Sequence, residues 1–184
     1  MLPKEKLRKR FIFLRKKKYF FVKKDFFRPL IKMLGIKNKI NISLYYPSNY
    51  EVDTFHLFEI LRKRKNSLTS LPKLLSNGKM KFVRWNLLDP LKINKYGFLE
   101  PLKDERGVNP DVIVVPLLAF DRLHNRLGYG KGYYDKFLSK YNNTKGKKPF
   151  LTIGLAFSFQ KYKKIPTTKS DIKLDYILTE KGVF

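Results

Sequence analysis

The sequence predicts a single α/β domain in which helices cover both faces of an open, mostly parallel sheet, giving three layers. Residues 112–115 are a β-branched run without polar alternation, typical of a central strand buried on both faces. Residues 40–46 form a second apolar strand that Pro47 ends, and residues 55–65 follow with apolar side chains on one helical face. A chain of 184 residues can build one sizeable core, whereas two domains would each be small.

The N-terminal segment, residues 4–24, is predicted to be an amphipathic basic helix that belongs to the domain. Leu7, Phe11 and Leu14 recur at i, i+4 and i+7, which places them on one helical face. We expect four phenylalanines to continue this core-facing side: Phe20, Phe21, Phe26 and Phe27.

The remaining elements follow in chain order. Asp53 or Thr54 is the expected N-cap of the helix over residues 55–65. Short strands over residues 68–75 and 79–85 are joined across Asn77-Gly78, which favours a tight hairpin turn, and we expect this pair to form one edge of a substrate site. A short helix, a polar loop and two last strands are predicted over residues 133–141, 142–148, 150–157 and 175–179.

Composition restricts the class of protein. The chain has no cysteine, which excludes disulfides, thiolate nucleophiles and sulfur-ligated metals, and fits a reducing compartment. Its longest apolar run, residues 112–120, contains Pro116 and is too short to span a bilayer. No signal-peptide apolar region follows the basic N-terminus. We therefore expect a cytoplasmic protein without a membrane partner, and we expect it to act as a monomer.

The formal charge of +26 has three interpretations. Residues 1–39 hold fifteen basic and two acidic side chains, and such blocks are typical of nucleic-acid binding. The abundance of lysine, asparagine, isoleucine, phenylalanine and tyrosine is also what coding DNA rich in A and T produces. A positive field would alternatively concentrate small polyanions such as ATP or a polyglutamylated cofactor. Because lysine is spread along the chain, nucleic acid is not the partner we expect.

Residues 126–135, RLGYGKGYYD, suggest a phosphate-binding loop. Alternating glycines let backbone N–H groups approach an anion, and Arg126 and Lys131 add positive charge. A helix that starts near Tyr133 would direct its first N–H groups at the same anion. Asp135 is placed to hold the magnesium ion that accompanies a nucleoside triphosphate. The spacing is neither that of the P-loop nor that of the dinucleotide fingerprint, so a glycine-rich turn packed by aromatic residues is the alternative.

Several dispersed segments match one family in the same order. They are KEKLR at residues 4–8, EVDT at 51–54, YGFLEP at 96–101, the stretch 116–135, IGLAF at 153–157 with Gln160, and IP at 165–166 leading to Asp171 and LD at 174–175. Over almost its whole length the chain resembles 5-formyltetrahydrofolate cyclo-ligase, also called 5,10-methenyltetrahydrofolate synthetase. The resemblance implies a Rossmann-like three-layer sheet similar to the NagB/RpiA/CoA-transferase-like fold.

The resemblance also implies a reaction and its residues. In that family, ATP phosphorylates the formyl oxygen of 5-formyltetrahydrofolate, N10 attacks, and loss of phosphate leaves the methenyl bridge. Magnesium would be held by Asp135 and Asp171, and the folate, possibly polyglutamylated, by Tyr46 and Glu51. Arg8, Arg126 and Lys131 would act in catalysis. ATP would contact Lys4, Glu5, Lys6, Leu7, Arg8, Arg126, Leu127, Gly128, Tyr129, Gly130, Lys131, Gly132, Tyr133 and Tyr134.

Simpler interpretations of the same residues stay open. Lys4 and Arg8 alone would suggest a solvated basic face. Glu51 alone could favour a helix N-terminus, and Asp171 could be an ordinary loop aspartate. The two histidines, His56 and His124, show no metal-site spacing and receive no role.

The chain departs from the family pattern at Leu117, where a glycine often follows the proline, and at Thr168 and Ser170, before Asp171. Lys131 stands where the family often has glycine, and we expect it to supply an additional phosphate contact. Two other classes of function remain alternatives: a basic RNA- or DNA-binding protein and a catalytically silent folate-binding relative.

Overall fold

The computed structural model describes residues 2–35, 39–103, 106–141 and 149–184. Its main feature is a seven-stranded sheet of order β11-β10-β9-β6-β1-β2-β3, parallel from β10 to β2 and antiparallel at each edge. The mostly parallel sheet is therefore confirmed. The strands are β1 (Ile40–Ser43), β2 (Ser67–Leu74), β3 (Met80–Arg84), β6 (Val112–Pro116), β9 (Leu151–Leu155), β10 (Tyr176–Thr179) and β11 (Gly182–Val183).

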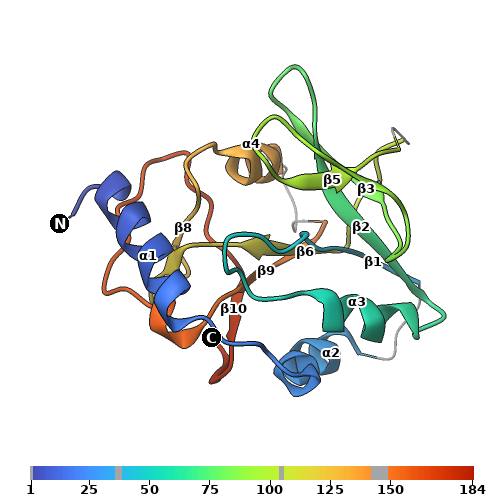
Figure 1. The fold of residues 1–184 in the computed structure, drawn as a ribbon, viewed down its shortest axis with the longest axis horizontal. Helices are drawn as coiled ribbons and strands as arrows, with labels where there is room; N and C mark the ends of the chain where they lie inside the picture. Colours follow the sequence, from blue (N-terminus) through green and yellow to red (C-terminus); the bar gives the residue numbers. More distant parts are fainter. Residues whose placement is uncertain (1, 36–38, 104–105, 142–148) are drawn as a thin grey trace.

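Helices cover both faces of this sheet, and Figure 1 shows α2 and α3 below it and α4 above it. Alternate residues of β6 point to opposite layers: Val112 and Val114 join the cluster that contains α2 and α3, whereas Ile113 and Val115 join the cluster that contains α4. The predicted burial of this strand on both faces is confirmed. The helical segments are α1 (Lys4–Lys18), η1 (Lys24–Phe27), α2 (Arg28–Leu34), α3 (Phe55–Arg62), α4 (Tyr133–Ser139) and η2 (Ser158–Gln160).

The first helix is shorter than predicted, because α1 ends at Lys18 and not near residue 24. Tyr19 leaves the helical region, with φ −59° and ψ 140°, so that its ring packs against Phe157 and Val22 reaches the core. The expected core positions of Phe26 and Phe27 are confirmed, whereas Phe20 and Phe21 are 41% and 78% exposed, so that part of the prediction was wrong.

The inner face of α1 packs on a small hairpin of β7 (Ala119–Phe120) and β8 (Arg126–Leu127). Leu7 and Phe11 are buried there against Leu118 and Leu127. Leu14 is only partly buried, and the next fully buried side chain of the helix is Arg15. The buried stripe thus runs at i, i+4 and i+8 and ends on a charge.

The predicted hairpin of β2 and β3 is confirmed, with Leu74 paired to Met80 and Gly78 in the turn at φ 73°. A second hairpin, of β4 (Leu91–Ile93) and β5 (Leu99–Pro101), was not predicted from the sequence. The predicted helices and last strands are present but shorter at their ends. The loop predicted over residues 142–148 lies outside the described residues.

The order of the strands fixes where a ligand site is expected. From β1 the chain proceeds to β2 on one side, whereas from β6 it proceeds to β9 and β10 on the other. Ligands of open α/β sheets bind at such a switch point, outside the carboxyl ends of the strands. Within the described ranges, none of the helices has the length and apolar character needed to cross a bilayer.

Candidate functional site

A cavity of about 460 Å³ lies at the carboxyl ends of β1 and β6, where the strand order predicts it. Several parts of the chain form its wall: α1, the loop after β1, the facing ends of β2 and β3, the β4–β5 hairpin, the end of β6, the glycine-rich loop with α4, and residues 168–171. The walls include Lys4, Arg8, Tyr45, Tyr46, Ser48, Glu51, Leu74, Met80, Tyr96, Phe98, Pro116, Arg126 to Lys136, Thr168, Ser170 and Asp171. Leu74 and Met80 bring the β2–β3 pair to one edge of this cavity.

The N-terminal helix brings two cations to the glycine-rich loop. Arg8 donates from Nε to the carbonyl oxygen of Gly128 at 3.0 Å, and Lys4 Nζ lies 2.5 Å from Asp171 Oδ2. Because these residues are four apart on α1, one helical face supplies both charges. Their interpretation as a purely solvated basic face is therefore wrong for this fold.

Two of the loop's glycines are required by the backbone. Gly130 has φ 96°, and a Cβ built on it would lie 3.0 Å from Arg8 Cζ. Gly132 has φ 68° and is the N-cap of α4. Gly128 has neither constraint, since a Cβ there meets nothing within 4 Å. Glycine at position 130 therefore allows the Arg8 side chain to pack against the backbone of the loop.

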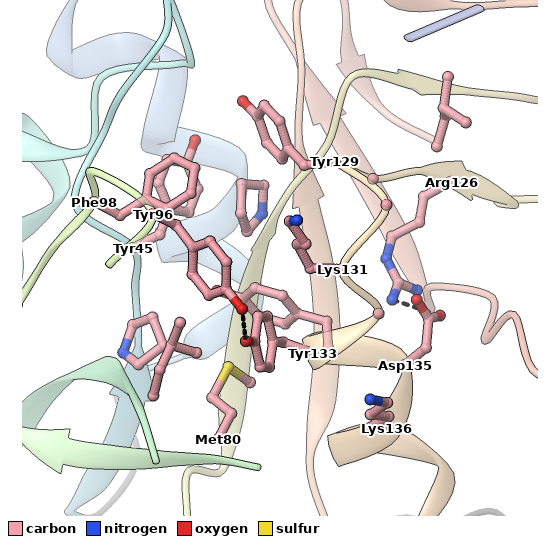
Figure 2. Close-up of a pocket in the computed structure, with 18 of the residues that line it drawn as sticks. Tyr45, Met80, Tyr96, Phe98, Arg126, Tyr129, Lys131, Tyr133, Asp135 and Lys136 are labelled. Carbon is pink, nitrogen blue, oxygen red and sulfur yellow. Dashed lines mark hydrogen bonds and ion pairs between the residues drawn. The ribbon is translucent and has the colours of Figure 1, made fainter. Parts of the chain in front are cut away.

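Arg126 and Asp135 form an ion pair at the start of α4, marked in Figure 2. Arg126 Nη2 donates to Asp135 Oδ1 at 2.7 Å, and its Nη1 donates to the carbonyl oxygen of Ile172. The same Oδ1 accepts from the Ile172 amide at 3.1 Å. Burial lowers the pKa of Arg126, an effect that Asp135 opposes. The pair ties the glycine-rich loop to the segment that carries Asp171.

The two predicted magnesium ligands line the same cavity, and their bonds leave one oxygen of each for a ligand. Asp171 Oδ2 accepts from Lys4 and from the Thr168 amide and hydroxyl. Despite its partial burial, these bonds lower the pKa of Asp171. Within the described residues, Oδ2 of Asp135 and Oδ1 of Asp171 take no part in the hydrogen bonds. Mg²⁺ is commonly held by one or two carboxylates plus substrate phosphates, so this donor set fits it.

These two carboxylates would hold Mg²⁺ only together with ligands from the substrate. The described part of the chain contains no group of three or more histidine, aspartate or glutamate side chains that could hold an ion. His56 and His124 are not among the residues that line this cavity.

A pair of tyrosines lies opposite the ion pair (Figure 2). The Tyr133 hydroxyl donates to Tyr96 Oη at 2.9 Å, which raises the pKa of Tyr133 to about 12 and lowers the pKa of Tyr96. Lys131 Nζ lies 5.0 Å from the centre of the Tyr96 ring, a cation–π contact. Lys131 therefore extends from the glycine-rich loop into the space between the two walls.

Glu51 is buried in the loop after β1 and lines the same cavity. Ser48 donates to its Oε2 from the amide at 2.9 Å and from the hydroxyl at 3.2 Å. Between them, Asn49 and Tyr50 have φ of 48° and 61°, a left-handed conformation that is uncommon without glycine. The bonds from Ser48 support this tight loop and fix where the carboxylate points.

The charge of Glu51 is balanced between opposing effects. Burial raises the pKa of Glu51, whereas Arg15 and the hydrogen bonds from Tyr129 and Ser48 lower it. The effect of burial is the larger, so the pKa of Glu51 lies above that of an ordinary glutamate. Glu51 does not cap α3: the Asp53 carboxylate accepts from the Phe55 amide at 2.8 Å and serves that end of the helix. The carboxylate of Glu51 instead bonds Ser48 and Tyr129.

Tyr134 supplies a polar atom without a protein partner. Its hydroxyl is buried, forms no hydrogen bond within the described residues and belongs to a side chain that lines the cavity. Burial, with the nearby Glu51, raises its pKa, so the phenol is protonated at neutral pH. Buried polar groups are normally paired, so this hydroxyl is available to a bound ligand.

A sequence model of the 5-formyltetrahydrofolate cyclo-ligase family matches residues 4–180. The chain belongs to this family. It is 34% identical over 143 residues to 5-formyltetrahydrofolate cyclo-ligase of Haemophilus influenzae, covering 75% of this chain and 74% of that protein. It is 32% identical over 149 residues to the protein of the same name in Escherichia coli, covering 78% and 79%.

Solved structures agree with the family in their architecture. The NMR structure of Aquifex aeolicus 5,10-methenyltetrahydrofolate synthetase has a TM-score of 0.73 at 30% identity, covering 99% of this chain and 92% of that one. The synthetase of Mycoplasma pneumoniae has a TM-score of 0.71 at 26% identity, covering 96% and 98%. The chain is thus a cyclo-ligase of folate metabolism.

Most of the residues that the family resemblance implied lie around this one cavity. The glycine-rich loop, Lys4, Arg8, Tyr46, Glu51, Asp135 and Asp171 all line it. Three of the implied ATP contacts do not: Leu7 is fully buried in the core under α1, and Glu5 and Lys6 are exposed on its outer face. Helical spacing explains this: residues 4 and 8 share the side of α1 that borders the cavity, Leu7 lies on the side packed on the β7–β8 hairpin, and residues 5 and 6 face outward.

Sequence reasoning missed several residues of the site. Tyr96 and Phe98 were quoted only as part of a motif, although the turn of the β4–β5 hairpin brings them to the cavity. Arg15 received no role beyond its place among the fifteen basic residues of residues 1–39, although it is buried beside Glu51. Of the family departures, Leu117 is buried and packs over Gly154, while Thr168 and Ser170 line the cavity next to Asp171.

Proposed function

We propose that the chain catalyses the ATP- and Mg²⁺-dependent conversion of 5-formyltetrahydrofolate to 5,10-methenyltetrahydrofolate, with release of ADP and phosphate. The formyl oxygen attacks the γ-phosphorus of ATP, and ADP leaves. N10 then attacks the activated formyl carbon and gives up its proton, and the C–O bond to phosphate breaks. The substrate class rests on membership of the family, and the ATP half is also supported by the residues present.

The observation that carries the proposal is that two chemically different groups of side chains line one cavity. The glycine-rich loop, Arg8 and Lys4 form a cationic group suited to phosphates, which we call the cationic end, whereas Tyr46 and Glu51 form an aromatic and acidic group suited to a pterin, which we call the folate end. A transfer between two substrates requires both within one enclosed space, because positioning supplies most of the catalysis of phosphoryl transfer.

At the cationic end, Arg8, Lys4 and Lys131 would neutralise the charge that spreads over the phosphate oxygens in the transition state. The left-handed Gly130 and Gly132 would let backbone amides approach that charge, and α4 begins at Tyr133, the residue after Gly132. Asp135 and Asp171 would hold Mg²⁺ together with the phosphates, and the ion would supply further charge neutralisation.

At the other end, Glu51 would accept hydrogen bonds from pterin N–H groups, for which it must be ionised. Tyr46 contributes an aromatic surface, which Phe55 and Trp85 hold in edge-to-face contacts at 5.2 and 6.3 Å between ring centres. The unpaired Tyr134 hydroxyl would donate to a polar atom of the folate. None of these roles requires a nucleophilic side chain.

The test is the near-ultraviolet absorbance of 5-formyltetrahydrofolate mixed with the protein, ATP and Mg²⁺. We expect a rise from methenyltetrahydrofolate that depends on ATP and on Mg²⁺, matched by an equal amount of ADP. A folded protein that binds the folate but produces no such rise would support a silent relative instead.

A further inference from the structure

Arg15 is a buried cation at the C-terminal end of α1 that the proposed reaction leaves without a role. Its side chain is 1% exposed, and its Nε has no hydrogen-bond partner among the described residues. A guanidinium loses strong hydration on burial, and an unpaired donor adds to that cost. Folding alone would therefore be served as well by an apolar residue in this position, which suggests a function.

The contacts of Arg15 lead to the folate end of the cavity. Its Nη2 donates to the Tyr129 hydroxyl at 2.6 Å, and that hydroxyl donates to Glu51 Oε1, also at 2.6 Å. Arg15 Nη1 lies 4.0 Å from the same carboxylate oxygen, and the guanidinium lies 5.4 Å from the centre of the Tyr129 ring. Arg15, Tyr129 and Glu51 thus form a chain of short bonds, which we name the Arg15 relay.

The direction of each bond in the Arg15 relay is fixed by chemistry. A guanidinium can only donate, so the Tyr129 oxygen must accept from Arg15 and its single proton must point to Glu51. Burial and the adjacent Glu51 raise the pKa of Tyr129, so its proton is retained at neutral pH. A donating phenol requires an acceptor, which an ionised Glu51 provides.

The Arg15 relay leaves Glu51 with capacity for a ligand. An ionised carboxylate offers about four acceptor positions, and Tyr129 and the two Ser48 donors occupy three. The carboxylate is therefore held at both oxygens, kept in one orientation, and still able to accept one further N–H. Since Glu51 lines the cavity, a bound substrate can supply that donor.

We propose that Arg15 is a positioning residue for the folate substrate, acting through Tyr129 to hold Glu51 ionised and oriented toward the pterin. This inference rests on the proposed function, because it takes the folate as the ligand of Glu51. Arg15 lies seven residues beyond Arg8 on the same helix, about 10 Å along its axis. It should therefore affect folate binding with little effect on the binding of ATP alone.

The experiment compares Arg15→Met, Arg15→Lys and Tyr129→Phe with the wild-type protein. Arg10→Met is the matched control, because it removes the same charge from the same helix at an exposed position outside the cavity. Dissociation constants for 5-formyltetrahydrofolate and for ATP are measured separately by calorimetry across a pH series. Circular dichroism and thermal unfolding establish that each variant is folded.

We expect Arg15→Met to weaken folate binding about 10- to 100-fold and Tyr129→Phe about 10-fold, as for bonds to charged groups. The double variant should be no weaker than Arg15→Met, because both changes break the same relay. ATP binding should stay within about twofold in Arg15→Met and Arg15→Lys, as should both affinities of Arg10→Met.

The pH series separates positioning from a structural effect. Four charged or titratable side chains surround Glu51: Arg15 on α1, Tyr129 in the glycine-rich loop, Tyr45 after β1 and Tyr134 on α4. Of these four, Arg15 alone is a cation. Removing it raises the pKa of Glu51, so the acid limb of folate affinity should move to higher pH in Arg15→Met. Arg15→Lys keeps the charge, and its limb should stay near that of the wild type.

A folded Arg15→Met that binds folate within twofold of the wild type, with an unmoved acid limb, overturns the inference. If Arg15→Met does not fold, the same result in Tyr129→Phe overturns it. If the wild type turns over the folate and the variants bind it with unchanged affinity, the inference about the Arg15 relay is refuted and the proposed function stands. If the wild type neither binds the folate nor turns it over, the proposed function is refuted as well.

Discussion

Replacement of Gly130 by alanine should disable the cationic end of the site through one contact. The added Cβ would lie 3.0 Å from Arg8 Cζ, 3.2 Å from its Nε and 3.3 Å from its Nη1. Because Gly130 has φ 96°, the backbone cannot relax easily toward a conformation that alanine favours. Arg8 must therefore move, and its bond to the Gly128 carbonyl at 3.0 Å is broken or stretched.

Two magnitudes follow from this geometry. The left-handed backbone should cost about 1–2 kcal/mol of stability, as for other non-glycine residues in that region. Displacement of Arg8 should remove a charge-assisted contact with phosphate worth about 1.5–3 kcal/mol. Each 1.4 kcal/mol is tenfold, so kcat/KM for ATP should fall by about 10- to 150-fold.

The assay is the ATP-dependent formation of methenyltetrahydrofolate, with urea unfolding to measure stability. A double-mutant cycle with Arg8→Ala tests the cause, since Gly130→Ala should have little further effect on kcat/KM once Arg8 is absent. Gly128→Ala is the control for folding, because its Cβ meets nothing within 4 Å, and we expect its stability to change by less than about 0.5 kcal/mol. Equal losses from Gly130→Ala with and without Arg8 would refute the reasoning.

Three further predictions concern the other walls of the cavity. Tyr134→Phe should leave thermal stability unchanged or higher, because its hydroxyl has no partner among the described residues, yet weaken folate binding measurably by calorimetry. Asp135→Asn should lower the free energy of unfolding by about 3 kcal/mol, because it leaves the buried Arg126 without its anionic partner. Asp171→Asn should have little effect on the free energy of unfolding. Both variants should raise the Mg²⁺ concentration needed for half-maximal turnover. The raised pKa of Glu51 means that the folded state binds a proton more tightly than the unfolded chain, so the stability it contributes is fully present below about pH 4.5 and declines as pH rises through the folded value. The difference in unfolding free energy between wild type and Glu51→Gln should therefore decrease with pH, and a constant difference would contradict this.

Local patterns predicted the parts of the site that depend on short-range chemistry. The β-branched run that became β6 pairs in parallel with β1 and β9 and is buried on both faces, the environment for which such a run without polar alternation is typical. The glycine-rich loop was found because left-handed residues such as Gly130 and Gly132 restrict the amino acid strongly. The spacing of Lys4 and Arg8 predicted a shared face, and the fold turns that face to the loop.

The residues that were missed depend on contacts between distant segments. Tyr96 reaches the cavity only because a hairpin inserted between β3 and β6 folds back over it, which no periodicity of its own short strands indicates. The core positions of Phe20 and Phe21 were wrong for a related reason: the helix ends at Lys18, and in the extended segment that follows, Val22 enters the core while Phe20 and Phe21 face outward. In both places the tertiary fold, and not local propensity, decides which side chain is inside.

The position of Arg15 in the sequence already indicates that it is buried, but the sequence alone does not show why. The stripe that begins with Leu7 and Phe11 continues at i+8 on Arg15, so the register alone places a charge at a core position. A charge there is normally evidence against the register, because arginine is almost never fully buried unless it is paired. Its partners lie 36 and 114 residues further along the chain, at Glu51 and Tyr129, and only the fold brings them together. A basic residue in the buried stripe of a helix therefore predicts a distant acceptor, and the search for that acceptor leads to the folate end of the site.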